Sequence, residues 1–295
     1  MDNNTKRVRR TSRPGSDSFG GDSGILNERV LVLVFESLKW DLHTLTAVAA
    51  VNRKLAAVAA RLLWRELCLY RAPRMLATLT SGSIPSTAAP GGRIDGGWKA
   101  LAKLMLFCCG YRGGGGGDGT GFPSPSNSPG HVAKASRFSK TSGRSFLAKK
   151  CRGDLLYVSD PCEHPAAEAG EDLGVYRGIF RGFMRSKTRA FLVKRGVRLE
   201  EKVRCPYCGA RVWSMTAARL VPRSAARRLG SRDGGLEYFV CINGHLHGMC
   251  WLIPLSSSDE DRAEEEEDGE SDGDDCEGKE ENGSTSSSRE DVMVK

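Results

Sequence analysis

No uninterrupted apolar run in this 295-residue chain reaches the roughly eighteen residues that a membrane-spanning helix needs. The N-terminus carries Lys6, Arg7, Arg9 and Arg10, but the long apolar stretch that a secretory signal requires does not follow them. We therefore expect neither a spanning segment nor export. The ten cysteines are then expected to be reduced, some of them on metal, because disulfides belong mainly to oxidising compartments.

The sequence also lacks the common motifs of catalytic sites. It contains neither HExxH nor the HxE…PCxxC pattern of zinc deaminases, and neither a Walker A nor a GxSxG motif. The glycine run at 113–117 is not followed by the Lys-Ser/Thr pair that phosphate binding requires, so it is expected to be a flexible tether. We therefore expect a non-catalytic protein without an open catalytic zinc.

Charge is distributed unevenly along the chain. The net charge is +8, but residues 254–295 contain 17 acidic and 4 basic residues, a net charge of −13. The other residues carry a net charge of +21. An acidic tail beside a basic body can fold back, modulate nucleic-acid binding or keep the chain soluble, and we expect the last of these.

Residues 26–70 form the most informative stretch. Asp41 and Asn52 each precede an apolar segment and can cap a helix there, so three short helices are predicted. The first carries apolar residues at steps of three and four: Leu26, Val30, Leu33, Val34 and Leu38. Three such helices bury little core alone, and the remaining apolar surface would suit a partner. On periodicity alone, a helical hairpin inside a larger core explains the pattern as well.

The cysteine spacing near the C-terminus predicts a zinc site. Cys205-Pro-Tyr-Cys208-Gly is typical of a zinc knuckle, in which two thiolates face one ion. Cys241 and His245 form a second such pair, with Asn243-Gly244 at its turn. The preferred ligands of a structural, tetrahedral zinc are Cys205, Cys208, Cys241 and His245, with Cys250 or His247 as replacements for His245.

Two alternatives to this zinc site stay open. The thiols can be reduced and metal-free, with Cys241 and Cys250 in the core. A redox CxxC would require a helix N-terminus beside the thiolate, whereas Arg211-Val-Trp is typical of a strand. Cys162-Glu-His164 is a weaker ligand pair, explained equally well as a turn after Asp160-Pro161.

The remaining patterns predict an α+β protein. Strand-like runs on both sides of Asn243-Gly244 predict a two-stranded ribbon over residues 236–254. Residues 155–158 are typical of a strand, and 98–107 of a short amphipathic helix. The predicted organisation is a disordered tail at 1–24, a helical domain at 25–80, a linker with the short helix and glycine-rich loop at 81–135, a C-terminal domain at 136–255, and a disordered acidic tail at 256–295.

Residues 26–70 resemble an F-box, the module that joins a substrate receptor to the Skp-type adaptor of a cullin ubiquitin ligase. Asn27 stands where many F-boxes have proline, and asparagine can cap the helix instead. With this module, several C-terminal blocks make the chain resemble the plant EID-like F-box proteins, relatives of the F-box regulator of far-red phytochrome A signalling. The blocks are CRGDLLYVSDPCEH at 151–164, GVYRGIFRGFMRSKTR at 174–189, CPYCGARVWSMTAA at 205–218 and YFVCINGHLHG at 238–248.

The resemblance implies a nuclear subunit of a Skp–cullin–F-box ligase in plant light or hormone signalling, abscisic acid included. Its fold would be a three-helix F-box, flexible linkers and a small β-rich, zinc-ribbon-like domain that presents a protein substrate. Its partners would be the adaptor, the cullin and that substrate, with no nucleic acid or membrane. The residues expected to form the adaptor-binding surface, some as core and some as contact, are Leu26, Val30, Leu33, Leu45, Val48, Leu55 and Trp64.

A second hypothesis is a nuclear zinc-binding protein that contacts nucleic acid through its basic C-terminal half. Phe180, Phe183 and Phe191 lie among arginines and lysines there, a combination that suits nucleic acid or an acidic partner. A solvated basic surface over buried aromatic residues explains the same pattern. A DNA-binding protein has no need of an F-box, and the sequence contains no recognised DNA-reading motif.

Overall fold

The computed structural model describes residues 27–80, 94–112, 123–133, 137–141, 146–165, 172–222, 225 and 236–252. No helix in these ranges has the length and apolar character needed to cross a membrane. Several predictions lie outside the described residues: both terminal tails, the glycine run at 113–117, much of the linker, and Leu26.

Helices α1 (Glu28–Ser37) and α2 (Leu42–Val51) begin where short polar side chains can replace missing backbone partners. The Asn27 side chain accepts a hydrogen bond from the backbone N–H of Arg29, and Asp41 accepts one from that of Thr44. Between the helices, Trp40 is buried and stacks on Phe35, with ring centroids 5.8 Å apart. Both rings belong to the core that the helices share.

A long helical segment follows, built from α3 (Arg53–Val58), a π-helical turn (Ala59–Leu63) and α4 (Trp64–Arg71). Asn52 begins it by accepting a hydrogen bond from the backbone N–H of Leu55. Pro73 begins α5 (Pro73–Thr80), because the missing N–H of proline costs nothing in a first turn. Helix α6 (Trp98–Leu106) packs against α4. Both predicted internal caps, Asp41 and Asn52, are confirmed.

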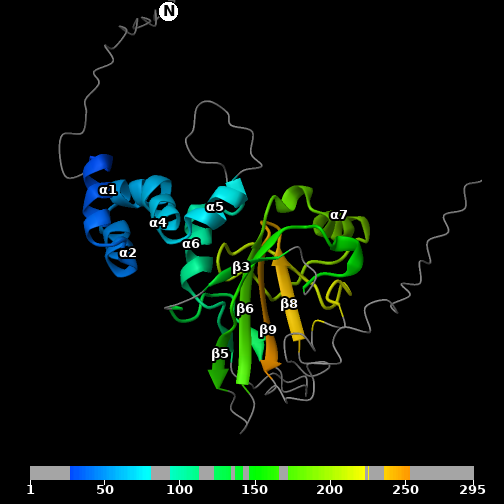
Figure 1. Cartoon of the computed structure of the whole chain (residues 1–295). Helices are drawn as coiled ribbons and strands as arrows, with labels where there is room; N and C mark the ends of the chain where they lie inside the picture. The colour runs from blue at the N-terminus through cyan, green and yellow to red at the C-terminus, as the bar shows by residue number, and fades with distance from the viewer. Residues whose placement is uncertain are drawn as a thin grey trace, which may run out of the picture. The chain divides into compact units, whose positions relative to one another are not determined.

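Most strands form one antiparallel sheet in the order β3-β4-β6-β9-β8-β7. Its members are β3 (Phe138–Thr141), β4 (Leu156–Ser159), β6 (Asp172–Phe180), β7 (Val212–Ser214), β8 (Leu236–Cys241) and β9 (His245–Leu252). A seventh strand, β5 (Cys162–Pro165), pairs with the first half of β6, while β4 pairs with its second half. Figure 1 shows β6 between β5 and β9 at the middle of this sheet.

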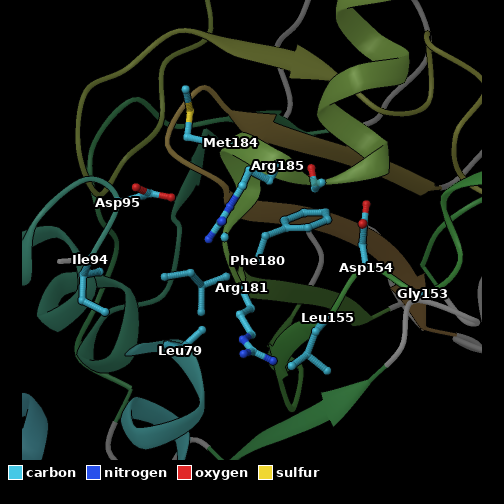
Figure 2. Close-up of a pocket in the computed structure, with 13 residues that line it drawn as sticks. Leu79, Ile94, Asp95, Gly153, Asp154, Leu155, Phe180, Arg181, Met184 and Arg185 are labelled. Carbon is cyan, nitrogen blue, oxygen red and sulfur yellow. The ribbon is translucent and has the colours of Figure 1, made fainter. Parts of the chain in front are cut away.

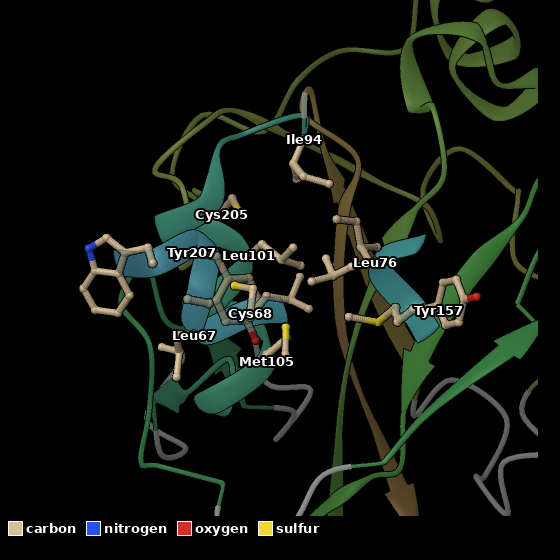
Figure 3. Packing of buried hydrophobic residues seen from close by; sticks show 14 of the residues in the cluster. Leu67, Cys68, Leu76, Ile94, Leu101, Met105, Tyr157, Cys205 and Tyr207 are labelled. Carbon is tan, nitrogen blue, oxygen red and sulfur yellow. The ribbon is translucent and has the colours of Figure 1, made fainter. Parts of the chain in front are cut away.

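The sheet is covered on both faces, and alternate residues of each strand therefore enter different cores. Leu173, Val175 and Ile179 of β6 belong to the core shared with the helices, whereas Tyr176 and Phe180 face the other core. Figure 3 shows the first core, where Leu67, Leu76 and Leu101 lie among residues of the sheet and of the 205–208 loop. The helical segment and the sheet therefore share apolar packing.

The remaining elements are short. Strands β1 (Tyr111–Arg112) and β2 (Ser124–Pro125) pair with each other, and 3-10 turns lie at Lys149–Cys151 and Phe183–Arg185. Helix α7 (Lys187–Lys194) begins at Ser186, whose side chain accepts a hydrogen bond from the backbone N–H of Arg189. The Asp154 carboxylate also accepts hydrogen bonds from the backbone N–H groups of Lys187 and Thr188.

These elements confirm the α+β class. Strands β8 and β9 realise the hairpin expected around Asn243-Gly244, and α6 realises the helix expected at 98–107. The extent of the sheet differs from expectation, because the hairpin is part of seven strands rather than a small separate ribbon. The added strands pair through backbone hydrogen bonds between segments distant in sequence, which local patterns do not reveal.

Candidate functional site

The 205–208 segment folds into a tight loop that carries two cysteines. Its backbone closes through hydrogen bonds from Cys205 N to Ala210 O (2.9 Å) and from Gly209 N to Cys205 O (2.8 Å). Tyr207 at its tip is buried and lies with its ring edge toward His245, at a centroid distance of 6.3 Å. The loop leads into β7, which pairs with β8 and so faces the β8–β9 turn.

The β8–β9 turn places Cys241 and His245 opposite this loop. The four ligand atoms of Cys205, Cys208, Cys241 and His245 all lie within 4.8 Å of one another. The Sγ atoms of Cys208 and Cys241 are 3.8 Å apart. The Nδ1 atom of His245 lies 3.7 Å from Cys205 Sγ and 3.6 Å from Cys241 Sγ.

These separations fit a tetrahedral zinc ion. Zinc bonds of about 2.3 Å to sulfur and about 2.0 Å to nitrogen place two sulfurs about 3.8 Å apart and a sulfur and a nitrogen about 3.6 Å apart. The surrounding groups also favour thiolate: the backbone N–H of His245 donates to Cys241 Sγ at 3.3 Å, and Asn243 Nδ2 donates to Cys208 Sγ at 3.5 Å. The chemistry and the spacing of the donors therefore suit a closed structural zinc site.

The thiols of this cluster differ in acidity. Hydrogen bonds from Cys205 and then Cys241 lower the pKa of Cys208 far below its usual value. The interaction with Cys208 raises the pKa of Cys205 to about 12, and burial raises the pKa of Cys241 well above its usual value. Zinc must displace the protons of any thiols that are protonated in the metal-free cluster, so affinity should fall in acid.

The two replacement ligands lie elsewhere. His247 is fully buried and stacks on Phe239, with ring centroids 5.4 Å apart. Cys250 projects to the opposite face of β9 from His245, as its odd separation along the strand requires, and packs in the second core. Among the described residues, the group within ligand distance contains His245 rather than either replacement.

Helix α1 has two apolar sides. Leu31 and Phe35 are buried in the core, whereas Leu33 is 64% exposed. Val30, Val34 and Leu38 are also exposed. Their spacing of four places them in one row that ends at the C-cap Leu38, and Val30 is three residues from Leu33 and so adjoins it. We call Val30, Leu33, Val34 and Leu38 the α1 apolar surface.

The residues predicted for adaptor binding divide between core and surface. Leu45 and Trp64 are buried, and Val48 and Leu55 are half-buried against the same core. Val30 and Leu33 are exposed on the α1 apolar surface. The prediction omitted Val34 and Leu38, although both belong to the periodic stripe. Which apolar side of α1 faces the core depends on the packing of α2 to α4, and the period alone does not reveal it.

The phenylalanines of the basic C-terminal half pack mainly against other residues of the protein. Phe180 and Phe183 are buried and lie 5.1 Å apart between ring centroids. Phe191 is half-buried, with Lys150 and Arg195 over its ring. Two of the three phenylalanines that were predicted to suit nucleic acid or an acidic partner are thus core residues.

A cavity of about 460 Å³ opens between the end of α5 and the Phe183–Arg185 turn. Figure 2 shows Arg181, Arg185, Asp95 and Asp154 around it. The Asp154 carboxylate accepts hydrogen bonds at the start of α7, so its main contribution there is structural. The lining combines charged and apolar side chains, with Leu79 on its apolar part.

Asn243, predicted only as a turn residue, is also a neighbour of the cluster. Its side-chain amide donates a hydrogen bond to Cys208. The only indication in the sequence is that Asn243 is a polar residue between two candidate ligands, and residues that hydrogen-bond to metal ligands commonly orient them.

Comparison with known proteins finds similarity over most of the chain. Residues 121–251 match the family model described as the EID1-like F-box protein 2 C-terminal domain. EID1-like F-box protein 3 of Arabidopsis thaliana is 62% identical over 265 residues, covering 90% of this chain and 93% of the relative. EID1-like F-box protein 2 of the same plant is 43% identical over 237 residues, covering 80% and 90%.

A more distant relative is the phytochrome A-associated F-box protein of Arabidopsis thaliana. It is 26% identical over 133 residues, which cover 42% of this chain and 38% of the relative. No solved structure was found to match the chain.

Proposed function

Because this chain belongs to the family of EID1-like F-box proteins, we propose that it is the substrate-recognition subunit of a Skp–cullin–F-box ubiquitin ligase. Such a subunit needs no catalytic residue. It raises the effective concentration of a target lysine near the loaded E2 enzyme, and proximity of this kind accelerates a bimolecular reaction strongly.

The observation that carries this proposal is the α1 apolar surface. An amphipathic helix normally buries one apolar side and leaves the other polar. Here Leu31 and Phe35 fill the core, while Val30, Leu33 and Val34 remain exposed on the same helix. Contiguous exposed apolar side chains are typical of an interaction surface, and a Skp-type adaptor is the partner that an F-box binds.

The sheet and its loops are the proposed substrate-presenting part. A structural zinc held by Cys205, Cys208, Cys241 and His245 would fix the 205–208 loop to the β8–β9 turn, without a role in chemistry. The name of the distant phytochrome A-associated relative supports light signalling as the process. We further propose a nuclear location, which the basic run at Lys6–Arg10 would serve, and a target in light or abscisic acid signalling.

Co-purification with a plant Skp-type adaptor tests the proposal. Leu33→Lys places a charge at the most exposed part of the α1 apolar surface and keeps a good helix former there. We expect adaptor affinity to fall by at least about tenfold, the equivalent of about 1.4 kcal/mol, because the ammonium group must be desolvated at the contact.

The matched control is Val193→Lys on α7, where the replaced side chain is also exposed, by 55%. It should retain wild-type adaptor affinity, and both variants should keep the wild-type circular dichroism spectrum. Equal affinity of both variants would contradict the proposed surface. A wild-type chain that binds no adaptor, but binds DNA with strong salt dependence, would favour the nucleic-acid hypothesis instead.

A further inference from the structure

The end of α6 lies beside a segment from the predicted linker. The backbone N–H of Cys108 donates to His131 O at 3.0 Å, and the N–H of Gly130 donates to Cys108 O at 2.8 Å. Phe107 and Val132 form a bridge next to these bonds. Backbone pairing therefore holds Cys108 and His131 side by side, although 22 residues separate them in sequence.

Strand β5 carries a further cysteine and a further histidine on one of its faces. Cys162 and His164 are two residues apart on the strand, so their side chains project to one side, while Glu163 between them is exposed. Pairing with β6 fixes their position, with Cys162 opposite Val175 and His164 opposite Leu173. The Cys162-Glu-His164 segment is thus a strand, and not the turn after Asp160-Pro161 that its sequence also permits.

The side chains of Cys108 and His131 lie close to those of Cys162 and His164. The Nε2 atom of His164 lies 3.3 Å from Cys108 Sγ, and the Nε2 atom of His131 lies 3.3 Å from Cys162 Sγ. The rings of the two histidines are 5.0 Å apart between centroids. All four ligand atoms lie within 4.8 Å of one another. A zinc ion between a sulfur and a nitrogen requires about 3.6 Å, so a shift of a few tenths of an ångström would complete the geometry.

We propose that Cys108, His131, Cys162 and His164 form a second zinc site, of the Cys2His2 type, separate from the cluster at the β8–β9 turn. Two thiolates and two imidazoles are a donor set that suits zinc. Four protein ligands complete its tetrahedron, so the site is structural rather than catalytic. The inference does not depend on the F-box assignment.

The site would cross-link three segments. Cys108 follows α6, His131 belongs to the 123–133 segment, and the other two ligands lie on β5. Helix α6 already packs on α4 and contacts the sheet, where Arg177 donates to the carbonyl of Met105. Zinc would add a coordinate cross-link between this helix and the sheet edge. If the proposed function holds, the ion would stiffen the connection between the adaptor-binding helices and the substrate-presenting sheet.

The zinc content of the purified full chain tests the site. Native mass spectrometry of the wild type should find two zinc ions per chain. A Cys162→Ser/His164→Ala variant should hold one, and a Cys208→Ser/Cys241→Ser variant should also hold one, because each removes two of the four ligands of one cluster. Cys276→Ser is the matched control: it removes a thiol that is not among the eight proposed ligands and should leave two ions.

Replacement of zinc by cobalt distinguishes the two sites by their absorption spectra, even if one variant folds poorly. Charge-transfer absorption from thiolate to cobalt grows with the number of sulfur ligands. The second site has two sulfurs and the first has three. His164→Cys should keep two ions and increase this absorption, because it exchanges a nitrogen for a sulfur ligand.

Three results would overturn the inference. One is a wild type that holds a single zinc ion, all of it lost in the Cys208→Ser/Cys241→Ser variant. Another is a Cys162→Ser/His164→Ala variant that still holds two. The third is a Cys108–Cys162 disulfide in the freshly purified, metal-replete protein. None of these results alters the expected adaptor affinity, so failure of this site and failure of the proposed function are distinguishable.

Discussion

On α1, Leu33 and Phe35 are two residues apart and face opposite sides, one toward solvent and the other into the core. The glycines at the two turns of the cluster that contains Cys205 and His245 also differ in their surroundings. Gly209 and Gly244 both adopt positive φ, +72° and +78°. A side chain at Gly209 would meet nothing within 4 Å, but a Cβ at Gly244 would lie 2.5 Å from the Cβ of Phe183. The same backbone conformation therefore has different consequences at the two turns.

Gly244→Ala should destabilise the chain more than Gly209→Ala. The control change should cost about 1 kcal/mol, from left-handed backbone strain alone. Gly244→Ala adds an overpacking cost of about 1–3 kcal/mol against Phe183. It also disturbs the turn between Cys241 and His245, so zinc affinity should fall. Urea denaturation of zinc-loaded proteins measures the difference, and equal losses for the two variants would contradict the steric argument.

At the element scale, helix starts and the hairpin were predictable because their determinants are local. Asp41 and Asn52 cap the helices that follow them, and Asn243-Gly244 turns β8 into β9. The full sheet was not predictable in this way. Strand β6 is paired on one side with β4 and β5 and on the other with β9, and these pairings join residues up to 80 positions apart, as for Asp172 and Leu252.

The cap of α2 should depend on pH. The Asp41 carboxylate accepts hydrogen bonds from both the side chain and the backbone N–H of Thr44, and these lower its pKa below the ordinary value of 3.8. Because the folded-state pKa is the lower one, the cap contributes fully above the unfolded pKa. The contribution is lost as pH falls through the folded value.

NMR titration of the Asp41 carboxyl measures this shift. Thr44→Val removes the hydroxyl donor and should return the pKa toward 3.8. Asp41→Asn should keep the helix N-terminus capped, since asparagine caps as well as aspartate, but without a contribution that varies in acid. An unchanged pKa in Thr44→Val would show that the hydroxyl is not the cause.

At the scale of the whole molecule, metal should couple the segments to one another. The ligands come from the 205–208 loop and the β8–β9 turn in one cluster, and from the residues just after α6, the 123–133 segment and β5 in the other. Unfolding would separate all of these segments, so zinc held at these sites would bind the folded chain far better than the unfolded one.

Removal of zinc should therefore lower the thermal midpoint of the full chain. With free zinc at 1,000 times its dissociation constant, one site contributes about 4 kcal/mol. For a chain of this size that is about 10 °C in the midpoint. Differential scanning calorimetry with and without chelator measures it. A variant that lacks Cys162, His164, Cys208 and Cys241 is the control and should not respond; an unaffected wild type would count against both sites.

Local patterns of residues are enough to predict the α+β class, the internal helix caps, the hairpin and the first group of candidate ligands. Each depends on residues close together in the chain: a cap reaches three residues, and Cys-x-x-Cys and Cys-x-x-x-His are each one turn. Long-range packing, in contrast, determines which side of α1 stays exposed and which ligand types meet at Cys108. Cys108 and His131 share no local spacing, and backbone pairing of distant segments brings them together.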